Sequence, residues 1–280
     1  MKVLPFKIPK PKDDVLIYQE DIGESFYNQL HQHEEIQLSI IIEGEGTLIV
    51  GNTVNSYKKG DVLVIGSHLP HVFKSDNSKI KISSMLTLFF TKPAFGTRFF
   101  ELNELNTLRP FFKRAAQGFK ISRHTTKIES LFQSLSSANK LERFITLLNI
   151  MKIVSRKQYE SLSSFVYDKN YNLADGKKLQ VIYDYTMTNF KKEISLDSIA
   201  DIANMTKSAF CKYFKKRTNK TYFSFLNELR IAHACKLLNE DVDMSISEIA
   251  FNSGYHNIAN FNRQFKAIKQ TTPSAFRKLL

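Results

Sequence analysis

The stretch ISLDSIADIANMTKSAFCKYFKK (194–216) is followed, further along the chain, by a near-copy, MSISEIAFNSGYHNIANFNRQFKA (244–267). Each copy opens with a serine that can cap a helix, Ser195 or Ser247, and continues with an Ile-Ala pair. The alanines of the two pairs are 50 residues apart, and the phenylalanines that follow are 51 residues apart. The last third of the chain is therefore predicted to hold the same helical unit twice.

A polar turn follows the Ile-Ala pair, and a second capping residue, Thr206 or Asn257, begins a helix of the form Phe-x-Lys/Arg-x-Phe-Lys. The two phenylalanines of each copy are four residues apart, so they share one helix face and are expected to be buried against the first helix. The alanine is small enough for the two helices to approach closely. The opposite face is predicted to carry these side chains: Ser208, Cys211, Lys212 and Lys215 in the first copy, and Ala259, Asn260, Asn262, Arg263 and Lys266 in the second.

Two short helices across a tight turn, with a protruding second helix of polar, amide and cationic groups, are typical of a helix-turn-helix unit. Such a helix suits the major groove of double-stranded DNA. One copy alone is equally well interpreted as an amphipathic helix pair with a solvated basic face. Two copies at matched spacing favour DNA reading. Residues 221–238 between them predict a long helix, a spacer that would hold the reading helices about 34 Å apart, one turn of DNA.

The C-terminal part of the chain, residues 177–280, resembles the AraC/XylS family of bacterial transcription regulators. The resemblance rests on both copies, on LNELRIAHACKLL (226–238) between them and on TTPSAFRK (271–278) after them. It implies a sequence-specific regulator that binds promoter DNA and is not an enzyme. Among the outward side chains, it implies that seven face bases or phosphates: Ser208, Cys211, Lys212, Ala259, Asn260, Asn262 and Arg263.

The chain departs from that family after each recognition helix, where a glycine is usual and Asn219 and Gln270 stand instead. Asparagine tolerates the left-handed backbone of a helix cap, so Asn219 fits the pattern. Gln270 is costlier in that conformation, and the second helix could therefore end differently. Ser208 and Ala259 are small, so base reading there would lean on apolar contact with thymine methyl groups.

The net charge of +13 points to a polyanionic partner, and the distribution of the charge indicates which part of the chain would bind it. Lysines and arginines less acids give 14 − 13 = +1 for residues 1–118, 9 − 5 = +4 for 119–176 and 17 − 9 = +8 for 177–280. The excess lies in the middle and the C-terminal part. The nearly neutral N-terminal part is expected to have another role.

Residues 25–90 alternate β-branched runs with glycine, asparagine and lysine turns, a pattern typical of a small barrel or sandwich. Residues 23–44 and 60–71 are similar to the two halves of a cupin barrel. In metal-binding cupins, two histidines, a glutamate and a later histidine converge inside the barrel. Here His31, His33 and His71 stand at matching positions, and Gln37 stands where the glutamate would be.

A neutral amide is a poor replacement for a carboxylate ligand, so we expect neither a metal nor another cofactor. His31, His33, Gln37 and His71 are interpreted instead as polar wall residues near the mouth of a pocket for a small-molecule effector. The alternative is a metal-dependent cupin enzyme with a nucleic-acid-binding tail. Gln37 and the lack of an acid–base constellation beyond the histidines disfavour it, so no catalytic residue is assigned.

The predicted architecture is α+β and multidomain: a cupin-like barrel with trailing helices (1–160), a linker (161–176) and a DNA-binding domain (177–280). Leucines and isoleucines at helical spacing predict that the middle section, 128–159, is helical. It would pack on the barrel or, by the family resemblance, take part in a homodimer. Two isolated cysteines, no long apolar run and no secretory signal predict a cytoplasmic protein that spans no membrane.

Overall fold

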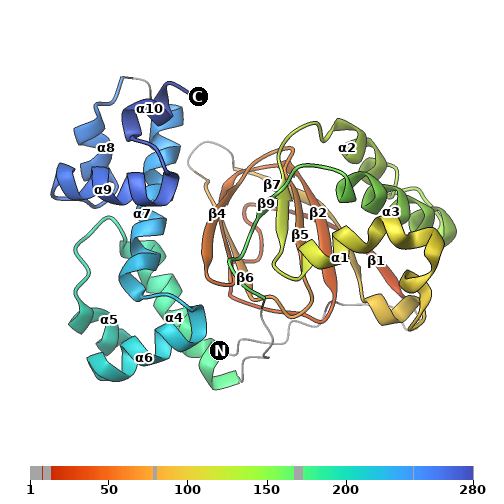
Figure 1. Cartoon of the computed structure of the whole chain (residues 1–280), viewed down its shortest axis with the longest axis horizontal. Helices are drawn as coiled ribbons and strands as arrows, with labels where there is room; N and C mark the ends of the chain where they lie inside the picture. Colours follow the sequence, from red (N-terminus) through yellow and green to blue (C-terminus); the bar gives the residue numbers. More distant parts are fainter. Residues whose placement is uncertain (1–7, 9–13, 78–80, 167–172, 242, 280) are drawn as a thin grey trace. The chain divides into compact units, whose positions relative to one another are not determined.

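The computed structural model describes residues 8, 14–77, 81–166, 173–241 and 243–279 (Figure 1). The chain forms two compact units, Met1–Leu173 and Ala174–Leu280. The first is built around β-sheets and the second is helical, which confirms the predicted α+β multidomain fold. No helix among these residues is both long and apolar enough to cross a membrane.

The N-terminal unit contains two antiparallel sheets. The larger has the order β1 (Leu16–Gly23), β7 (Ser83–Phe90), β2 (Ile36–Glu43), β5 (Val62–Ile65), β8 (Phe119–Ile121) and β9 (Glu160–Ser161). The smaller has the order β4 (Thr53–Tyr57), β3 (Gly46–Val50) and β6 (His71–Ser75). Residues 44–46 carry the chain from β2 of the larger sheet to β3 of the smaller sheet.

Both faces of strand β2 are buried, which explains its nearly continuous apolar sequence. Leu38 and Ile40 join the core shared with the trailing helices. Ile41 joins the core that also contains residues of the smaller sheet. Because successive side chains of a strand point to opposite faces, Gln37 and Ser39 lie on the same face as Ile41, toward the barrel interior.

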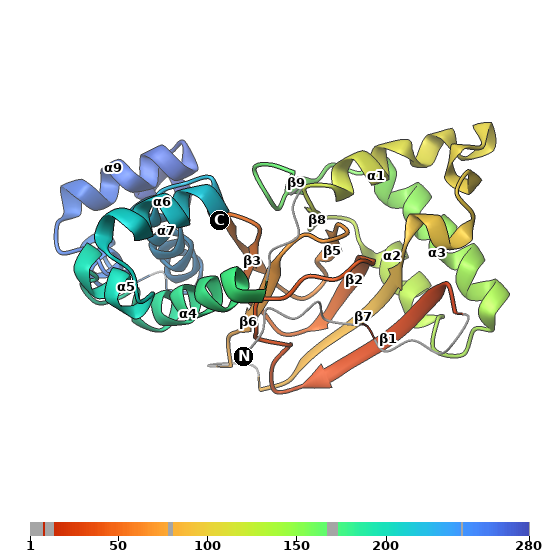
Figure 2. The same ribbon diagram turned by 90° about the horizontal axis from the view of Figure 1, so that it is seen from below.

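Helices follow the strands and pack on the outer face of the larger sheet (Figure 2). They are the short 3-10 helices η1 (Lys92–Phe95), η2 (Phe99–Glu101) and η3 (Asn103–Leu108), and the α-helices α1 (Arg109–Ala115), α2 (Thr126–Gln133) and α3 (Lys140–Ser155). In the section predicted to be helical, 128–159, Leu135 and Met151 are fully buried, whereas Leu141 and Ile145 are 66% and 50% exposed. The apolar side chains of this section therefore pack partly within the unit and partly face solvent.

The segment predicted as a linker, 161–176, contributes to the barrel over its first residues. Leu162 is fully buried, and its carbonyl oxygen accepts a hydrogen bond from the Asn55 amide at 3.0 Å. The amide of Asn52 donates to Ser164 Oγ at 2.6 Å. Residues 167–172 lie outside the described part, and helix α4 (Leu173–Asn189) has begun before residue 177.

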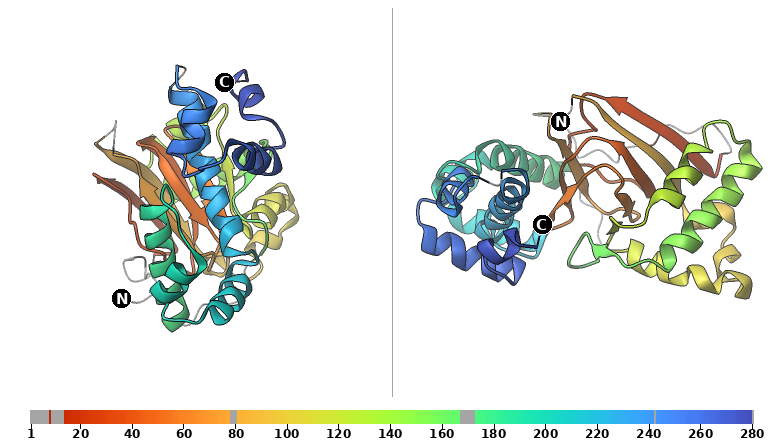
Figure 3. Two further views of the ribbon diagram at one scale, coloured as in Figure 1. Left: turned by 90° about the vertical axis from the view of Figure 1, so that its left-hand side faces the viewer. Right: turned by 90° about the horizontal axis from the view of Figure 1, so that it is seen from above.

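The C-terminal unit is built around one long helix, α7 (Tyr222–Glu240). Figures 1 and 3 show α7 running between two groups of shorter helices. The first group is α4, α5 (Leu196–Ile202) and α6 (Lys207–Thr218), and the second is α8 (Ile246–Asn252), α9 (Ile258–Lys269) and α10 (Pro273–Arg277). Phe225 of α7 stacks on Tyr183 of the first group, with ring centroids 4.9 Å apart. Ile231, Ala234 and Leu238 belong to the core of the second group.

Candidate nucleic-acid interface and barrel histidines

Side-chain caps begin all four helices of the two predicted units. Ser195 caps α5, and Thr206 and Asn257 cap α6 and α9, as predicted. The prediction of Ser247 for α8 is wrong, because Ser245 is the cap and forms a capping box with the residue three positions on. Ser247 lies within the first turn of that helix, whereas Ser245 precedes it and accepts the backbone hydrogen bond.

The turns inside the two units have matching geometry. Each contains a residue with a left-handed backbone, Asn204 with φ of 51° and Gly254 with φ of 85°. The turns are closed by equivalent backbone hydrogen bonds: Met205 N–H to the Ala200 oxygen (2.9 Å) and Tyr255 N–H to the Ala250 oxygen (3.0 Å). A Cβ on Gly254 would lie 2.5 Å from the Phe190 oxygen, so only glycine fits.

The paired phenylalanines anchor each reading helix to its unit. Phe210, Phe214, Phe261 and Phe265 are all fully buried. Tyr222 of α7 contacts both rings of α6, with centroids 5.4 and 5.5 Å apart. Because these aromatic faces are fixed, the opposite faces of α6 and α9 are held toward solvent.

All nine predicted DNA-contacting residues are exposed, and they lie on α6 and α9: Ser208, Cys211, Lys212, Lys215, Ala259, Asn260, Asn262, Arg263 and Lys266. Arg263 donates from Nη2 to Asn260 Oδ1 at 3.0 Å, so two of them are already oriented by each other. Among the described residues, the four cations of this set form no ion pair. They are available to neutralise phosphates.

Ile258 is a further candidate for DNA contact, which the sequence pattern alone did not single out. It is the first residue of α9 and is 42% exposed, although it is apolar. N-terminal residues of a recognition helix contact base edges, and an apolar group there suits a thymine methyl. Its position directly after the cap Asn257 was the signal that could have found it.

The end of α9 corrects a second expectation. Gln270 adopts φ of 58° and its backbone N–H donates to the Lys266 oxygen, as Asn219, with φ of 54°, does with Lys215 in α6. Both reading helices therefore end with the same left-handed cap. Gln270 bears the steric cost of that conformation rather than avoiding it.

The structure brings the barrel histidines together. His31, His33 and His71 each offer a ligand nitrogen, and these atoms lie within 4.8 Å of one another. The side-chain amide of Gln37 lies 3.3 Å from Nε2 of His33 and 3.0 Å from Ser39 Oγ. All four residues are buried rather than open to solvent, since none exposes more than 7% of its surface.

Backbone carbonyl oxygens fix the three rings. Nδ1 of His31, His33 and His71 lies 2.8 Å from the oxygens of Gln29, Glu35 and Leu69 respectively. These contacts favour the proton on Nδ1 of each ring. In His33 the second nitrogen, Nε2, faces Gln37 Oε1 at 3.3 Å, and the shorter contact of Nδ1 is the one that takes the proton. Burial lowers the pKa of His31 to about 4 and also lowers the pKa values of His33 and His71, so the cluster is neutral.

Neutral imidazoles with carbonyl-fixed Nδ1 atoms match the nitrogen ligands of zinc-type sites. His71 Nε2 is buried and has no hydrogen-bond partner among the described residues. Against a metal, Gln37 offers an amide instead of a carboxylate. The His31 and His71 ring centroids are also only 4.1 Å apart, so these two rings pack against each other.

Comparisons with known protein families match both units. Residues 199–279 match the helix-turn-helix domain family, and residues 20–83 match the cupin domain family. The chain is 22% identical over 276 residues to the uncharacterized HTH-type transcriptional regulator YdeC of Bacillus subtilis, covering 95% of this chain and 92% of that protein. It is 23% identical to an uncharacterized HTH-type transcriptional regulator of Staphylococcus aureus, of which it spans only 34%.

Solved structures also align with the chain. ToxT from Vibrio cholerae covers 94% of this chain and 98% of its own length, at 12% identity and a TM-score of 0.37. The DNA-binding domain of AdpA, solved with a target DNA, covers 35% of this chain and 87% of its own, at 21% identity and a TM-score of 0.33. A Listeria innocua protein of unknown function covers 36% and 95%, at 28% identity and a TM-score of 0.34.

Proposed function

As an AraC-type helix-turn-helix regulator with an N-terminal cupin domain, this chain carries two candidate DNA-reading helices, and we propose that it binds promoter DNA through both. The observation that carries this proposal is the matched geometry of the two units. Both turns close on an alanine, both reading helices are anchored by two buried phenylalanines, and both present cations to solvent. Such a regulator would act in the cytoplasm, where promoters are accessible.

The nine residues assigned to DNA contact divide by chemistry. Arg263, Asn260 and Asn262 have side chains that can form paired hydrogen bonds with guanine or adenine edges. The lysines Lys212, Lys215 and Lys266 supply point charges for phosphates. Ser208, Cys211, Ala259 and the added Ile258 are short or apolar and suit close approach to the groove. We assign sequence preference mainly to α9 and phosphate affinity mainly to α6.

The test is binding of the full chain to its own promoter region by fluorescence anisotropy, with a scrambled duplex as competitor. We expect the variant Asn260→Ala/Arg263→Ala to lose the preference for the promoter over the scrambled duplex. Lys278→Ala, an exposed cation in the last residues of the described chain, is the matched control and should keep that preference. Equal affinity of the native chain for both duplexes would contradict sequence-specific binding.

We also propose that the N-terminal unit responds to a small-molecule effector, with His31, His33, Gln37 and His71 on the ligand's path. A row of polar side chains runs from His33 through Gln37 and Ser39 to Thr87. The Gln37 amide donates to Ser39 Oγ at 3.0 Å, and the hydroxyl oxygens of Ser39 and Thr87 are 2.8 Å apart. Such a row inside an apolar barrel is a polar strip that a hydroxylated ligand could use. A homodimer remains part of the proposal, and the exposed Leu141 and Ile145 of α3 are its candidate surface.

The cupin-enzyme alternative depends on the same histidines. Their ligand nitrogens converge, which is the one observation in its favour. It predicts a stoichiometric metal in the purified protein, whereas the regulator proposal needs none. Elemental analysis separates the two.

A further inference from the structure

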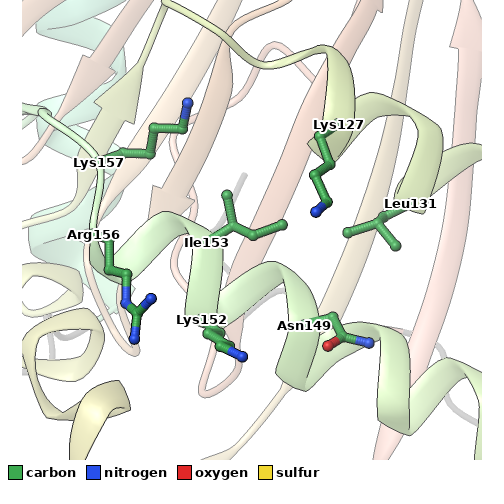
Figure 4. Close-up of a pocket in the computed structure, with 7 residues that line it drawn as sticks. All are labelled: Lys127, Leu131, Asn149, Lys152, Ile153, Arg156 and Lys157. Atoms are coloured by element: carbon green, nitrogen blue, oxygen red, sulfur yellow. The ribbon is translucent and has the colours of Figure 1, made fainter.

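A groove lies in the N-terminal unit between helices α2 and α3, away from the histidine cluster. Its volume is about 550 Å³. It is lined by four cationic residues, two apolar residues and one amide: Lys127, Lys152, Arg156, Lys157, Leu131, Ile153 and Asn149. No acidic side chain lines it. Figure 4 shows Lys127 reaching from α2 toward Ile153 and Asn149 of α3.

The four cations of this groove are not paired with carboxylates anywhere in the described parts of the chain. Lys157 alone has a partner of another kind, since its Nζ donates to the His124 carbonyl oxygen at 2.9 Å. Elsewhere in the same unit, exposed lysines do find acids, as Lys59 does with Glu43 at 2.8 Å. The groove therefore concentrates uncompensated positive charge, which an anion would relieve.

Helix electrostatics explain only part of this arrangement. Lys152 lies in the last turn of α3 and Arg156 is its C-cap, and cations at a helix C-terminus are stabilising. Lys127 is the second residue of α2, where the helix dipole disfavours a cation. Its charge is therefore not explained by the stability of α2. A negatively charged group bound between the two helices would account for it.

We propose that this groove binds a small organic phosphate. The charge suits a phosphate dianion, because guanidinium and ammonium groups bind phosphate oxygens strongly, and Lys127 of α2 and Arg156 at the end of α3 supply one cation from each side of the groove. Leu131 and Ile153 form an apolar floor for the organic part of the ligand. The volume lies within the range of about 300–1,000 Å³ that small-molecule sites occupy. This groove is separate from the proposed effector path at the histidines. The N-terminal unit would therefore bind two classes of ligand at two sites.

The experiment is isothermal titration of the full-length protein, at fixed ionic strength, with glucose 6-phosphate, adenosine monophosphate and inorganic phosphate. We expect at least one organic phosphate to bind more tightly than inorganic phosphate. The variant Lys127→Gln/Arg156→Gln should weaken that binding at least about tenfold. Asn149→Asp, which adds one negative charge without changing the shape of the groove, should weaken it as well.

Matched controls keep the result specific. Lys113→Gln removes an exposed lysine of α1 outside the groove, and Asn103→Asp adds a carboxylate elsewhere in the unit. Both should bind the phosphate like the native protein. The proposal is overturned if neither organic phosphate binds better than inorganic phosphate, or if Lys113→Gln weakens binding as much as the double variant. Without ligand, the double variant should bind promoter DNA normally, so a failure of DNA binding is counted separately.

Discussion

Arg263 projects from α9 between the two buried phenylalanines and away from them. Its guanidinium is long enough to form two parallel hydrogen bonds with a guanine edge. Lys212 holds the equivalent place on α6, but an ammonium group is a point charge and tolerates many geometries. We expect Arg263→Ala to cost about 1–3 kcal/mol of binding free energy and to relax the preference at one base position. Lys212→Ala should weaken all sequences similarly and reduce the salt dependence.

Binding selections over randomised sites, repeated at two salt concentrations, measure both effects. Circular dichroism confirms that each variant is folded. An unchanged sequence preference after Arg263→Ala would remove α9 from base reading. The DNA-binding proposal would then rest on phosphate contacts and on α6.

The neutral histidines make the stability of the barrel sensitive to acid. Burial lowers the pKa of His31 to about 4, against about 6.5 in an unfolded chain, and lowers the pKa values of His33 and His71 too. Between these pH values the unfolded state binds more protons than the folded state. The stabilisation is therefore complete above about pH 6.5 and is lost as the pH falls toward 4, by up to about 1.4 kcal/mol per pH unit for each histidine.

Hydrogen exchange of the β2 amides, followed between pH 7 and pH 5 in the presence of a chelator, reports this loss once the intrinsic exchange rates are corrected. The variant His71→Gln removes one of the three titrating groups and should flatten the pH dependence. His256→Gln changes an exposed histidine of the other unit and should leave it as it is. A slope that is the same in all three proteins would contradict the assignment.

The histidines also carry a prediction about metal content. We expect purified protein to hold zinc, iron or manganese only substoichiometrically, because Gln37 gives no carboxylate and the rings of His31 and His71 pack against each other. His33→Ala should leave DNA affinity nearly unchanged. The measurement is elemental analysis of the native protein and this variant. One tightly held ion per chain, absent from His33→Ala, would favour the enzyme hypothesis.

At the scale of single residues, the sequence predicts features that depend only on neighbouring residues, such as helix caps. Thr206 and Asn257 were identifiable as caps because each precedes a helical pattern. Ser247 was mistaken for a cap because Ser245, two residues earlier, is an equally good candidate by composition. The groove that Lys127 and Arg156 both line could not be predicted from the sequence, since it depends on how α2 and α3 pack.

At the scale of a helix, the left-handed backbone of Gln270 at the end of α9 leads to a prediction about stability. A left-handed backbone costs a residue with a Cβ about 1–2 kcal/mol, and glycine avoids that cost. We expect Gln270→Gly to stabilise the C-terminal unit by about 0.5–1 kcal/mol, because the greater freedom of glycine in the unfolded chain offsets part of the gain. Asn219→Gly should gain less, since asparagine tolerates this conformation.

Urea denaturation of the two variants, compared with the native sequence under the same conditions, gives both differences in free energy of unfolding. Both substitutions replace the left-handed C-cap residue of a helix, Asn219 in α6 and Gln270 in α9. A neutral or destabilising effect of Gln270→Gly would show that its side chain, whose Nε2 donates to the Ala267 oxygen at 2.9 Å, offsets the backbone cost.

Elements with strong local periodicity were predictable, and elements held by distant partners were not. The helices of the C-terminal unit follow from caps and apolar spacing alone. Strand β9 has only two residues and exists because it pairs with β8, which lies far earlier in the chain. Leu162 was placed in a linker because its neighbours are serines, yet the barrel core surrounds it. Long-range pairing of this kind leaves little trace in a local pattern.

On the scale of the whole molecule, the division into two units predicts that the C-terminal unit works alone. The fragment 174–280 has its own core and most of the excess positive charge. We expect it to fold and to bind duplex DNA, with log K falling linearly against log salt by about 0.9 per phosphate neutralised. Anisotropy titrations between low and physiological salt measure the slope. A folded fragment that binds no DNA, including its own promoter, would count strongly against the proposed function.

Helix α7 contributes to the cores on both sides of it. Its length therefore has a consequence for the spacing of the DNA sites that α6 and α9 would contact. Each residue added to a helix turns its end by about 100° and advances it by about 1.5 Å. A single insertion in α7 would therefore swing one reading helix away from the face of the duplex that the other engages. Under the proposed function, the bases of an operator could change in either half, whereas the spacing between the two halves would be fixed by the length of α7.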